Sequence, residues 1–443
     1  MTERRPLAAL VLAAGKGTRM RSSLPKVLHP LLGRPLVWFP LTLARELGAA
    51  PIVAVLGHGA SVVGKVIPED VQIAIQAEPL GTADAVRVGL AALGEFEGEV
   101  LVLSGDVPLL TRGTLEKLLL AGGPVALVTA FAADPSGYGR ILRGADGHLQ
   151  RIVEEKDADV AQRSVREINA GLYRFESGFL REHLGKVTAQ NAQQELYLTD
   201  LVALAAAAGG VRVVTAPLAE VSGINDRREL SRAAASLRAT INARHQAEGV
   251  TLVDPAATYI DLSVVLGRDV TIEPGCVLIG QTRVEAGSVL RAHSVLEDAH
   301  VGPGCTIGPF ARLRPGTTLA AGVHIGNFVE TKNARLGAGT KANHLSYLGD
   351  AEVGARVNVG AGTITCNYDG EKKSMTTLGD DVFIGSDTQL VAPVTVGAGA
   401  YVGAGSTIDT DVPADSLVFT RAARVVKEGW AKRKRESRGP AKV

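Results

Sequence analysis

The first half of the chain alternates short apolar runs with segments whose apolar residues recur at helical spacing. The runs predict buried β-strands at residues 7–12, 52–56, 71–75, 100–103 and 125–131, and the segments predict helices at residues 36–47, 83–93 and 114–120. Alternating strands and helices are typical of a mostly parallel sheet with helices on both faces. Because ligands bind such sheets at the carboxyl ends of the strands, we expect functional residues in the loops that follow them.

A period of six residues begins near position 260. Aliphatic residues recur every six residues from Ile260 to Leu296. The next step, to Val301, is one residue shorter, and the period of six then continues with interruptions to Ile408. This period fits a solenoid in which each hexapeptide forms one short face and three faces complete a coil. The aliphatic side chain is expected to point inward, while glycine allows the corner. Small or β-branched residues often take the fifth place, as at Thr282, Ser288, Thr317 and Thr388.

A helical pattern joins the two halves, and a basic run ends the chain. Residues 227–246 place apolar side chains on one face and arginines elsewhere, which predicts a long connecting helix that Gly249 closes. The run 432–435 is all Lys and Arg, so we expect residues 427–438 to form a solvated, disordered tail. The chain thus divides into residues 1–226, a linker helix at 227–249, and a solenoid with a basic tail at 250–443. The apolar face of the linker consists of Leu230, Ala234, Leu237 and Ile241.

Composition narrows the class of protein. A chain of 443 residues is expected to hold two or three domains, and 47 Lys and Arg against 46 Asp and Glu give a net charge of +1, which argues against a binder of nucleic acid or membrane surfaces. A hydrophobic content of 46% excludes global disorder, and 4% aromatic residues with 51 glycines favour narrow aliphatic cores. Three scattered cysteines and no apolar run of the ~18–20 residues that a bilayer requires predict a soluble cytoplasmic protein with free thiols.

The loop after the first predicted strand, from Leu12 to Met20, is suited to an anion. Its small residues let backbone N–H groups approach a phosphate, and Lys16 and Arg19 add positive charge. It is not a Walker A loop, because Gly17 follows the lysine, and it lacks the third glycine of the dinucleotide fingerprint. A generic glycine-rich turn is the alternative for this stretch taken alone.

The residues around this loop favour a nucleotide site. Lys26 brings another cation, and Asp106 follows the predicted strand 100–103, at the edge where a metal bound to phosphates is expected. Gly81 and Thr82 are suited to holding a base edge or a ribose. With its Leu-Ala-Ala-Gly-x-Gly-Thr-Arg-Met loop and later Pro-Lys, the segment resembles the sugar-1-phosphate nucleotidyltransferases.

Within that group, the chain resembles the bifunctional bacterial family that joins a uridyltransferase to a hexapeptide-repeat acetyltransferase. The resemblance extends from Leu7 to about Trp430 and rests on the order and spacing of several motifs. These are Gln-Ala-Glu at 76–78 with Gly-Thr at 81–82, Gly-Tyr-Gly-Arg at 137–140, Ile-Val-Glu-Glu-Lys at 152–156, Glu-Ile-Asn-Ala-Gly at 167–171 and Gly-Ile-Asn at 223–225. It implies an α/β nucleotidyltransferase with a Rossmann-like mixed sheet, then an all-β left-handed parallel β-helix.

The implied function is the synthesis of UDP-N-acetylglucosamine in two steps. Acetyl-CoA acetylates glucosamine 1-phosphate, and UTP then transfers its uridylyl group to N-acetylglucosamine 1-phosphate with release of pyrophosphate. The uridyl step belongs to residues 1–226 and the acetyl step to residues 250–443. In the uridyl step the sugar phosphate oxygen attacks the α-phosphorus, so catalysis comes from positioning and charge neutralisation.

The resemblance also implies the residues of the uridyl site. Asp106 and Asn225 hold Mg²⁺, while Arg19 and Lys26 act on the phosphates. Family members commonly have Tyr where this chain has Ser104, so we expect a weaker contact to the nucleotide here and an unaffected metal role for Asp106. The residues implied to bind UTP or UDP-N-acetylglucosamine are Leu12, Ala13, Ala14, Gly15, Lys26, Gln76, Gly81, Thr82, Gly105, Asp106, Gly139, Glu154, Asn169 and Asn225.

Polar side chains gather in the solenoid where its period is interrupted, at residues 367–377. An insertion there predicts a projecting loop, which is a usual place for a binding surface. Acetyl transfer to an amine needs a base near neutrality, an oxyanion donor and cations for the phosphates of coenzyme A. A lone histidine on a coil is more often structural, but His344 lies among further polar residues and suits the base.

The resemblance assigns the remaining roles in the solenoid. His344 is the general base, and Arg314, Lys332, Tyr347 and Asn358 bind glucosamine 1-phosphate. Proteins of this kind are homotrimers with acetyl-transfer sites between subunits. The residues implied to contact acetyl-CoA are Ala361, Asn367, Tyr368, Ser386, Ala404 and Arg421.

Three alternatives stay open on the sequence. One is a monofunctional sugar-1-phosphate nucleotidyltransferase with a regulatory or oligomerising β-helix, which acetyl-CoA turnover would distinguish. Another is a metal hydrolase or lyase with zinc bound by His293, His300 and His324, although their spacing follows no known motif. The third is a non-enzymatic scaffold, which is disfavoured because both halves carry site residues of the same family.

Overall fold

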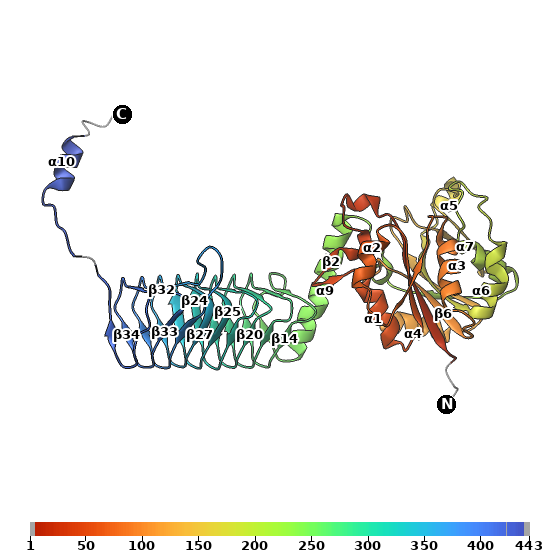
Figure 1. The fold of residues 1–443 in the computed structure, drawn as a ribbon. Coiled ribbons are helices and arrows are strands. Elements are labelled where there is room, and N and C mark those ends of the chain that lie inside the picture. Colours follow the sequence, from red (N-terminus) through yellow and green to blue (C-terminus); the bar gives the residue numbers. More distant parts are fainter. Residues whose placement is uncertain (1–4, 422, 438–443) are drawn as a thin grey trace. The chain divides into compact units, whose positions relative to one another are not determined.

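The computed structural model describes residues 5–421 and 423–437. The chain divides into two units whose boundary lies between Arg238 and Ala239. This boundary falls inside α9 (Arg227–Ala247), and Figure 1 shows the sheet and helices of the first unit and the stacked coils of the second. Each unit is described by itself below.

A mixed sheet forms the centre of the first unit. Its strands follow the order β11-β7-β10-β6-β1-β4-β5, and the hairpin of β8 and β9 attaches to β10. The neighbours β6-β1-β4-β5 are parallel as expected, whereas β10 runs antiparallel to both β6 and β7. The strands are β1 (Leu7–Ala13), β4 (Ile52–Leu56), β5 (Gln72–Ile75), β6 (Glu99–Ser104), β7 (Val125–Phe131), β8 (Arg140–Arg143), β9 (Leu149–Val153), β10 (Glu167–Glu176) and β11 (Val211–Thr215), with a separate short pair, β2 (Pro30–Leu31) and β3 (Arg34–Pro35).

Helices cover both faces of this sheet and create two cores. Alternate residues of β1 contact opposite layers: Val11 packs with residues of α1 and α4, and Leu10 packs with residues of α3 and α7. Continuous apolar runs such as β1 are needed because both of their faces are buried. The helices are α1 (Trp38–Glu46), α2 (Ala60–Val63), α3 (Thr82–Ala92), α4 (Arg112–Leu120), α5 (Val160–Arg163), α6 (Ser177–His183), α7 (Thr199–Ala207) and α8 (Leu218–Val221), with one-turn 3₁₀ segments η1 (Thr18–Met20), η2 (Lys26–Leu28), η3 (Gly64–Val66) and η4 (Leu184–Lys186).

One predicted strand is less buried than its composition suggested. Ile73 and Ile75 of β5 are 45% and 52% exposed. The reason is position, since β5 is the last strand in the sheet order and only β4 pairs with it. An apolar run alone does not distinguish an edge strand from a central one.

The carboxyl ends of β1 and β6 lie side by side. Leu12 of β1 pairs with Ser104 of β6, and both strands end within one residue of this pair. The loop that begins at Ala14 and the Gly105-Asp106 turn therefore leave the sheet at the same edge. This is the edge at which the sequence predicted the phosphate and metal site.

The second unit is a parallel β-helix, as the period of six predicted. Equivalent residues of successive coils pair directly, for example Ile260 with Leu278 and Leu278 with Leu296. One face is the sheet β12 (Thr251–Leu252), β15 (Thr271–Ile272), β18 (Val289–Leu290), β21 (Thr306–Ile307), β24 (His324–Asn327), β26 (Lys341–His344), β28 (Asn358–Val359), β31 (Phe383–Ile384), β34 (Tyr401–Val402) and β36 (Leu417–Val418). The other strands form one sheet: β13 (Tyr259–Ile260), β14 (Val265–Leu266), β16 (Val277–Ile279), β17 (Arg283–Val284), β19 (Val295–Glu297), β20 (His300–Val301), β22 (Arg312–Leu313), β23 (Thr318–Leu319), β25 (Glu330–Leu336), β27 (Tyr347–Val353), β29 (Ile364–Cys366), β30 (Thr376–Leu378), β32 (Gln389–Val391), β33 (Val394–Val396) and β35 (Thr407–Ile408).

The interior of the β-helix holds the residues that the period predicted. The repeating aliphatic side chains are buried, except that Leu266 is partly exposed because β14 ends its column of strands. The small fifth-place residues are buried too, and the hydroxyls of Thr282, Ser288 and Thr388 donate to backbone carbonyls. Thr282 donates to the carbonyl of Ile279 and Thr388 to that of Gly385, each at 2.7 Å. This explains why a small polar residue recurs at that place.

The predicted interruption is a loop between β29 and β30, which projects from the coils in Figure 1. Tyr368 and Lys373 pair across this loop in an isolated bridge. Strand β27 is long enough to pair with β29 at one end and with β30 at the other, so the stack continues on both sides of the insertion.

The connecting helix is confirmed, but the tail differs from its prediction. Leu230, Ala234 and Leu237 of α9 pack against residues of the first unit, and Ile241 is buried. Residues 430–436 form a short exposed helix, α10 (Trp430–Glu436), because this charged stretch holds good helix formers without Gly or Pro. Arg438, the last residue of the predicted tail, lies outside the described residues. Within the described chain, we find no helix of the length and apolarity needed to cross a membrane.

Candidate active sites

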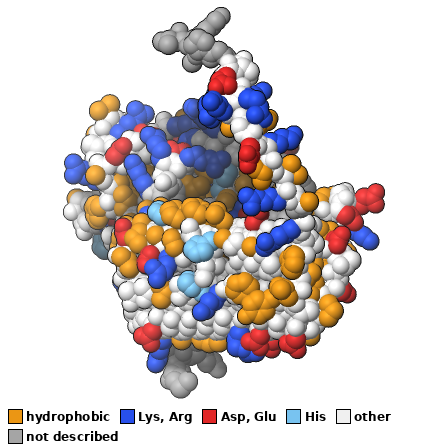
Figure 2. Space-filling model, turned by 90° about the vertical axis from the view of Figure 1, so that its left-hand side faces the viewer, with side chains coloured by type: hydrophobic (Ala, Val, Ile, Leu, Met, Phe, Trp, Pro, Cys, Tyr) orange, Lys and Arg blue, Asp and Glu red, His pale blue; other side chains and the backbone are white. Residues whose placement is uncertain are grey.

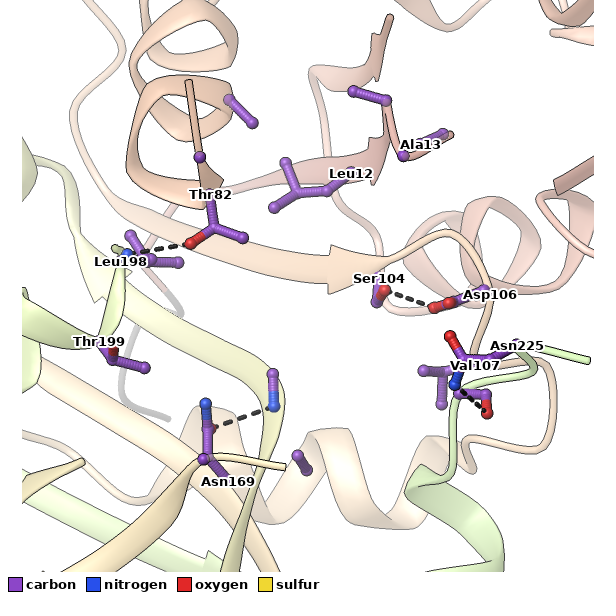
Figure 3. Close-up of a pocket in the computed structure, with 18 of the residues that line it drawn as sticks. Leu12, Ala13, Thr82, Ser104, Asp106, Val107, Asn169, Leu198, Thr199 and Asn225 are labelled. Carbon is purple, nitrogen blue, oxygen red and sulfur yellow. Dashed lines mark hydrogen bonds between the residues drawn. The ribbon is translucent and has the colours of Figure 1, made fainter. Parts of the chain in front are cut away.

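A cavity of about 650 Å³ opens at the carboxyl edge of the first unit's sheet. Figure 3 shows Asp106 and Asn225 close together on one side of it, with Thr82, Leu198 and Thr199 on the other. The sequence-predicted residues that line it are Leu12, Ala13, Ala14, Gly15, Lys26, Gln76, Gly81, Thr82, Asp106, Gly139, Glu154, Asn169 and Asn225.

Two predicted residues lie outside that lining. Gly105 sits behind it, because its N–H donates to the carbonyl of Leu12 at 2.8 Å and an added Cβ would lie 3.0 Å from that oxygen. Gly105 therefore lets β6 approach β1, and its contact with the nucleotide stays a prediction. Arg19 reaches the site indirectly, since its guanidinium donates to Oδ1 of Asn225 at 3.0 Å.

The glycine-rich loop is fixed by its contact with Lys26. Gly17 has a φ of 58°, and a Cβ there would lie 2.5 Å from the Cβ of Lys26. Only glycine fits this position without displacing the lysine. The sequence thus brings the loop and the second cation together by one close backbone approach.

The ammonium group of Lys26 bridges the two predicted metal ligands. It forms an ion pair with Oδ2 of Asp106 and donates to Oδ1 of Asn225 at 3.2 Å. The two oxygens therefore already meet at one positive charge. Carboxylate and amide oxygens are the ligand types that Mg²⁺ takes, and a site with two protein ligands leaves the others to phosphates and water. The residues present fit a magnesium ion.

Ser104 has a role that the sequence did not suggest. Its hydroxyl donates to Oδ1 of Asp106 at 2.5 Å, as Figure 3 shows. The serine therefore orients the carboxylate from the side opposite Lys26. A direct contact of Ser104 with the nucleotide is not needed to explain its presence in the cavity wall.

The opposite part of the cavity is polar and poorly solvated. Burial raises the pKa of Glu154, and Thr199 partly offsets this by donating to its Oε1 at 3.3 Å. Asn169 donates from Nδ2 to the hydroxyl of Tyr173 at 2.6 Å, and burial raises the pKa of that phenol. Thr199 and Tyr173 were missed by the sequence analysis, because neither belongs to a motif and only the fold brings them here.

The second candidate site lies at a corner of the β-helix beside His344, whose side chain is exposed. Nδ1 of His344 lies 2.9 Å from Oδ1 of Asn327, one coil away. An amide oxygen only accepts, so Nδ1 carries the proton and Nε2 is left with its lone pair. This arrangement leaves His344 ready to act as a base from its outer nitrogen.

Three cations gather beyond this corner. Arg314 follows β22 and Lys332 lies in the neighbouring strand β25, while Lys373 comes from the projecting loop. The charges of Lys373 and Arg314 lower the pKa of Lys332. Arg314 is paired with Glu330 at 2.8 Å. Lys373 was missed, although two adjacent lysines in the interrupted stretch were a signal for it.

The other predicted acceptor-site residues lie on both sides of the corner. Tyr347 begins β27, and its hydroxyl lies against Gly349. A Cβ added to Gly349 would be 2.2 Å from this hydroxyl, so a larger residue there would displace the tyrosine. Asn358 belongs to the face that carries His344, where it pairs with Lys341. No hydrogen bond joins Asn358 to Tyr347 among the described residues.

The residues predicted to contact acetyl-CoA form two groups. One edge of successive coils carries Ala361, Ser386 and Ala404. The carbonyl of Ala361 accepts from the N–H of Asp387 at 2.7 Å, and the carbonyl of Ser386 accepts from the N–H of Gly405 at 2.8 Å. Arg421 continues this column, with its guanidinium 3.5 Å from the carbonyl of Ala404. Asn367 and Tyr368 belong to the projecting loop instead.

Within the loop, Asn367 points inward and Tyr368 outward. The amide of Asn367 donates to Oδ2 of Asp350 and is buried, whereas Tyr368 is 60% exposed. Asn367 thus anchors the loop to the coil, whereas Tyr368 exposes its ring and donates its hydroxyl to the carbonyl of Gly370 at 2.5 Å.

The zinc alternative finds no support in the geometry. Among the residues that the structure describes, no three or more His, Cys, Asp or Glu side chains are grouped to hold a metal ion. His293 stacks on Phe310 with ring centroids 5.2 Å apart, and Nε2 of His300 pairs with Glu285 at 2.8 Å.

Comparison with known proteins matches both units. The MobA-like NTP transferase domain family matches residues 9–172, and the bacterial transferase hexapeptide family (six repeats) matches residues 298–333 and 375–410. A protein of Trichlorobacter lovleyi named Bifunctional protein GlmU is 50% identical over 97% of this chain and 99% of its own length. Proteins of the same name from Geobacter sulfurreducens and Anaeromyxobacter sp. (strain Fw109-5) are 48% and 52% identical, over 97% and 98% of this chain and 99% and 94% of their own lengths.

Proposed function

The chain belongs to the GlmU family of bifunctional proteins, and on that premise we propose which residues carry its two activities. It is a bifunctional enzyme of UDP-N-acetylglucosamine synthesis, a glucosamine-1-phosphate N-acetyltransferase and an N-acetylglucosamine-1-phosphate uridyltransferase. Residues 1–226 carry the uridyl step, residues 250–443 carry the acetyl step, and the helix at 227–249 joins them. A cytoplasmic location, where UTP and acetyl-CoA are made, is part of the proposal.

In the uridyl step, the cavity holds UTP with its phosphates at the glycine-rich loop. Backbone N–H groups near Gly15 and the cations Lys16 and Lys26 face the phosphates, and Glu154 and Asn169 hold the sugar. The phosphate oxygen of N-acetylglucosamine 1-phosphate attacks the α-phosphorus, and pyrophosphate leaves. These residues align the two substrates and exclude water from between them.

Asp106 and Asn225 are the residues that would hold Mg²⁺. Bound there, the ion would supply positive charge against the phosphates. Support for this comes from their oxygens, which converge on the ammonium of Lys26. Lys26 and Arg19 would then pair with phosphate oxygens, and Ser104 keeps the Asp106 carboxylate turned to the cavity.

In the acetyl step, Nε2 of His344 takes a proton from the ammonium of glucosamine 1-phosphate. The free amine attacks the thioester carbonyl of acetyl-CoA, and the C–S bond breaks as the nitrogen loses a second proton to water and becomes the amide. The thiolate of coenzyme A takes the proton held by His344 and leaves as the thiol. Arg314, Lys332 and Lys373 hold the sugar phosphate, with Tyr347 and Asn358 at the sugar. The cofactor lies along the column Ala361, Ser386, Ala404 and Arg421, whose small residues leave room for an extended chain, and Tyr368 contacts it from the loop.

A homotrimer completes this second site. Phe310, Phe328 and Leu345 are 49%, 56% and 63% exposed, and each occupies the same corner of a successive coil. The rings of Phe310 and Phe328 stack with centroids 5.5 Å apart, so they present a continuous apolar strip next to His344. Hydrophobic and histidine side chains lie together on the face shown in Figure 2. A second copy that covers the strip would enclose a base that one chain leaves open to water.

The observation that carries the proposal is the presence of two separate constellations, Lys26 with Asp106 and Asn225 in one unit and His344 with Asn327 in the other. The test is an assay of purified protein with glucosamine 1-phosphate, acetyl-CoA, UTP and Mg²⁺ that follows both coenzyme A thiol and pyrophosphate.

Two variants complete that experiment. We expect His344→Ala to abolish thiol release and spare pyrophosphate release from N-acetylglucosamine 1-phosphate, and Asp106→Ala to do the reverse. Loss of both activities in either folded variant would contradict the assignment. Wild-type protein that releases pyrophosphate but never thiol would favour the monofunctional nucleotidyltransferase.

A further inference from the structure

The side-chain amide of Gln76 is held in one orientation by two acceptors. Its Nε2 donates to the backbone carbonyl of Gly81 at 3.0 Å and to Oδ2 of Asp84 at 2.9 Å. A carbonyl and an ionised carboxylate accept hydrogen bonds and donate none, so the nitrogen of the amide has to face them. The chemistry of the two partners therefore fixes which end of the amide turns toward the cavity.

Asp84 is well placed to impose this orientation. It lies in the first turn of α3 and is only 3% exposed. Its other oxygen, Oδ1, accepts from Nε of Arg87 at 3.1 Å, so both carboxylate oxygens are engaged. A buried carboxylate that is bonded on both sides has little freedom to turn.

The orientation leaves Oε1 as the atom of Gln76 that a ligand meets. Gln76 lines the cavity and is 7% exposed. Within the described chain, no group donates a hydrogen bond to this oxygen. An acceptor that faces the cavity without a protein donor can take an N–H from a ligand.

We propose that Asp84 is a positioning residue for nucleotide selection, which holds the Gln76 amide so that its oxygen faces the base. The proposal rests on the uridyl transfer assigned to this cavity. Uracil and thymine carry an N3–H that Oε1 can accept. Cytosine carries a lone pair at N3, so two acceptors would face each other and the base would be rejected. Asp84 thus favours UTP over CTP without touching either nucleotide.

The test compares kcat/KM for UTP and CTP in wild-type protein and in Asp84→Asn, with saturating N-acetylglucosamine 1-phosphate and Mg²⁺. Asparagine keeps the shape of aspartate but removes the charged acceptor, so only the Gly81 carbonyl still favours the nitrogen of the Gln76 amide. A larger fraction of the protein can then turn this amide over and present its N–H to N3 of cytosine. We expect the UTP-to-CTP ratio to fall by about tenfold to a hundredfold, the range that one exchanged hydrogen bond supplies. Asp84→Ala, which frees the amide without offering a donor, should lower the ratio less.

The matched control is Asp70→Asn, the same exchange at an aspartate that pairs with Arg45 and is not among the residues lining the cavity. Its ratio should equal that of the wild type. General loosening of the fold would lower both rates together and leave the ratio unchanged, and thermal melts followed by circular dichroism show whether each variant is folded. An unchanged ratio in folded Asp84→Asn, or an equal fall in Asp70→Asn, would overturn the inference. Wild-type protein that fails to turn over UTP would overturn the proposed function instead.

Discussion

The hydrogen bond between His344 and Asn327 allows a quantitative test of the acetyl-transfer site. Its 2.9 Å contact fixes the proton on Nδ1 and leaves Nε2 as the basic atom. Replacing Asn327 with alanine removes the acceptor while His344 itself remains. The imidazole then loses its preferred tautomer and its orientation, so a smaller fraction of the enzyme is competent at any moment.

The expected loss follows from the strength of one neutral hydrogen bond. Such a bond contributes about 0.5–1.5 kcal/mol net, which corresponds to a decrease of about 2- to 12-fold in kcat for acetyl transfer. His344→Ala removes the base itself and should cost about 10²- to 10⁴-fold. The two variants should therefore differ clearly in size.

The assay measures release of coenzyme A thiol at saturating acetyl-CoA and glucosamine 1-phosphate, in wild type, Asn327→Ala, His344→Ala and the double variant. Because Asn327 acts through His344, its removal should have no further effect once His344 is gone. Pyrophosphate release in the uridyl reaction should stay at the wild-type rate in all four proteins. If Asn327→Ala lowered the rate by the same factor with and without His344, the proposed coupling between them would be wrong.

Three further predictions concern other parts of the molecule. Lys373→Ala should raise KM for glucosamine 1-phosphate by about tenfold, the effect of one charge-assisted contact, with a smaller change in kcat; an unchanged KM would exclude Lys373 from the phosphate site. Glu154→Gln should slow uridyl transfer yet raise the melting temperature of the first unit at pH 7. Burial raises the pKa of Glu154, so its ionised form destabilises the native state at pH values above that pKa. The rise in melting temperature should therefore shrink as the pH falls through the raised pKa and vanish below the ordinary glutamate range. A rise that does not depend on pH would show that burial of the charge is not its cause. Leu313→Ala should lower the free energy of unfolding by about 2–5 kcal/mol in urea titrations, because Leu313 is fully buried, and a loss under 1 kcal/mol would show that the coil collapses around the gap.

The period of the β-helix was predictable because its geometry repeats. Each short face must bury one side chain, so the aliphatic positions from Ile260 to Ile408 appear directly in the sequence. The sheet of the first unit was predicted less completely. Neither the antiparallel direction of β10 nor the exposed edge at Ile73 is encoded in a local run, because both depend on which strands become neighbours.

In the candidate sites, too, the features set by a local pattern could be predicted, and those set by contacts between distant segments could not. The loop at Gly15 and the turn at Asp106 follow strands that could be located, so their convergence at one edge could be predicted. Thr199 and Lys373 gain their roles through contacts between segments far apart in the chain. Spacing along the sequence does not reveal such contacts.

The loop between β29 and β30 has a consequence for how this protein could diversify. Because β27 pairs with Ile364 before the loop and with Thr376 after it, the ladder of backbone bonds closes around the inserted residues. Changes in the exposed part of residues 368–375 alter the groups that the loop presents to solvent and leave the supporting ladder as it was. If the loop contacts the substrates as proposed, libraries confined to this segment sample new acyl or sugar preferences with little expected loss of heat resistance.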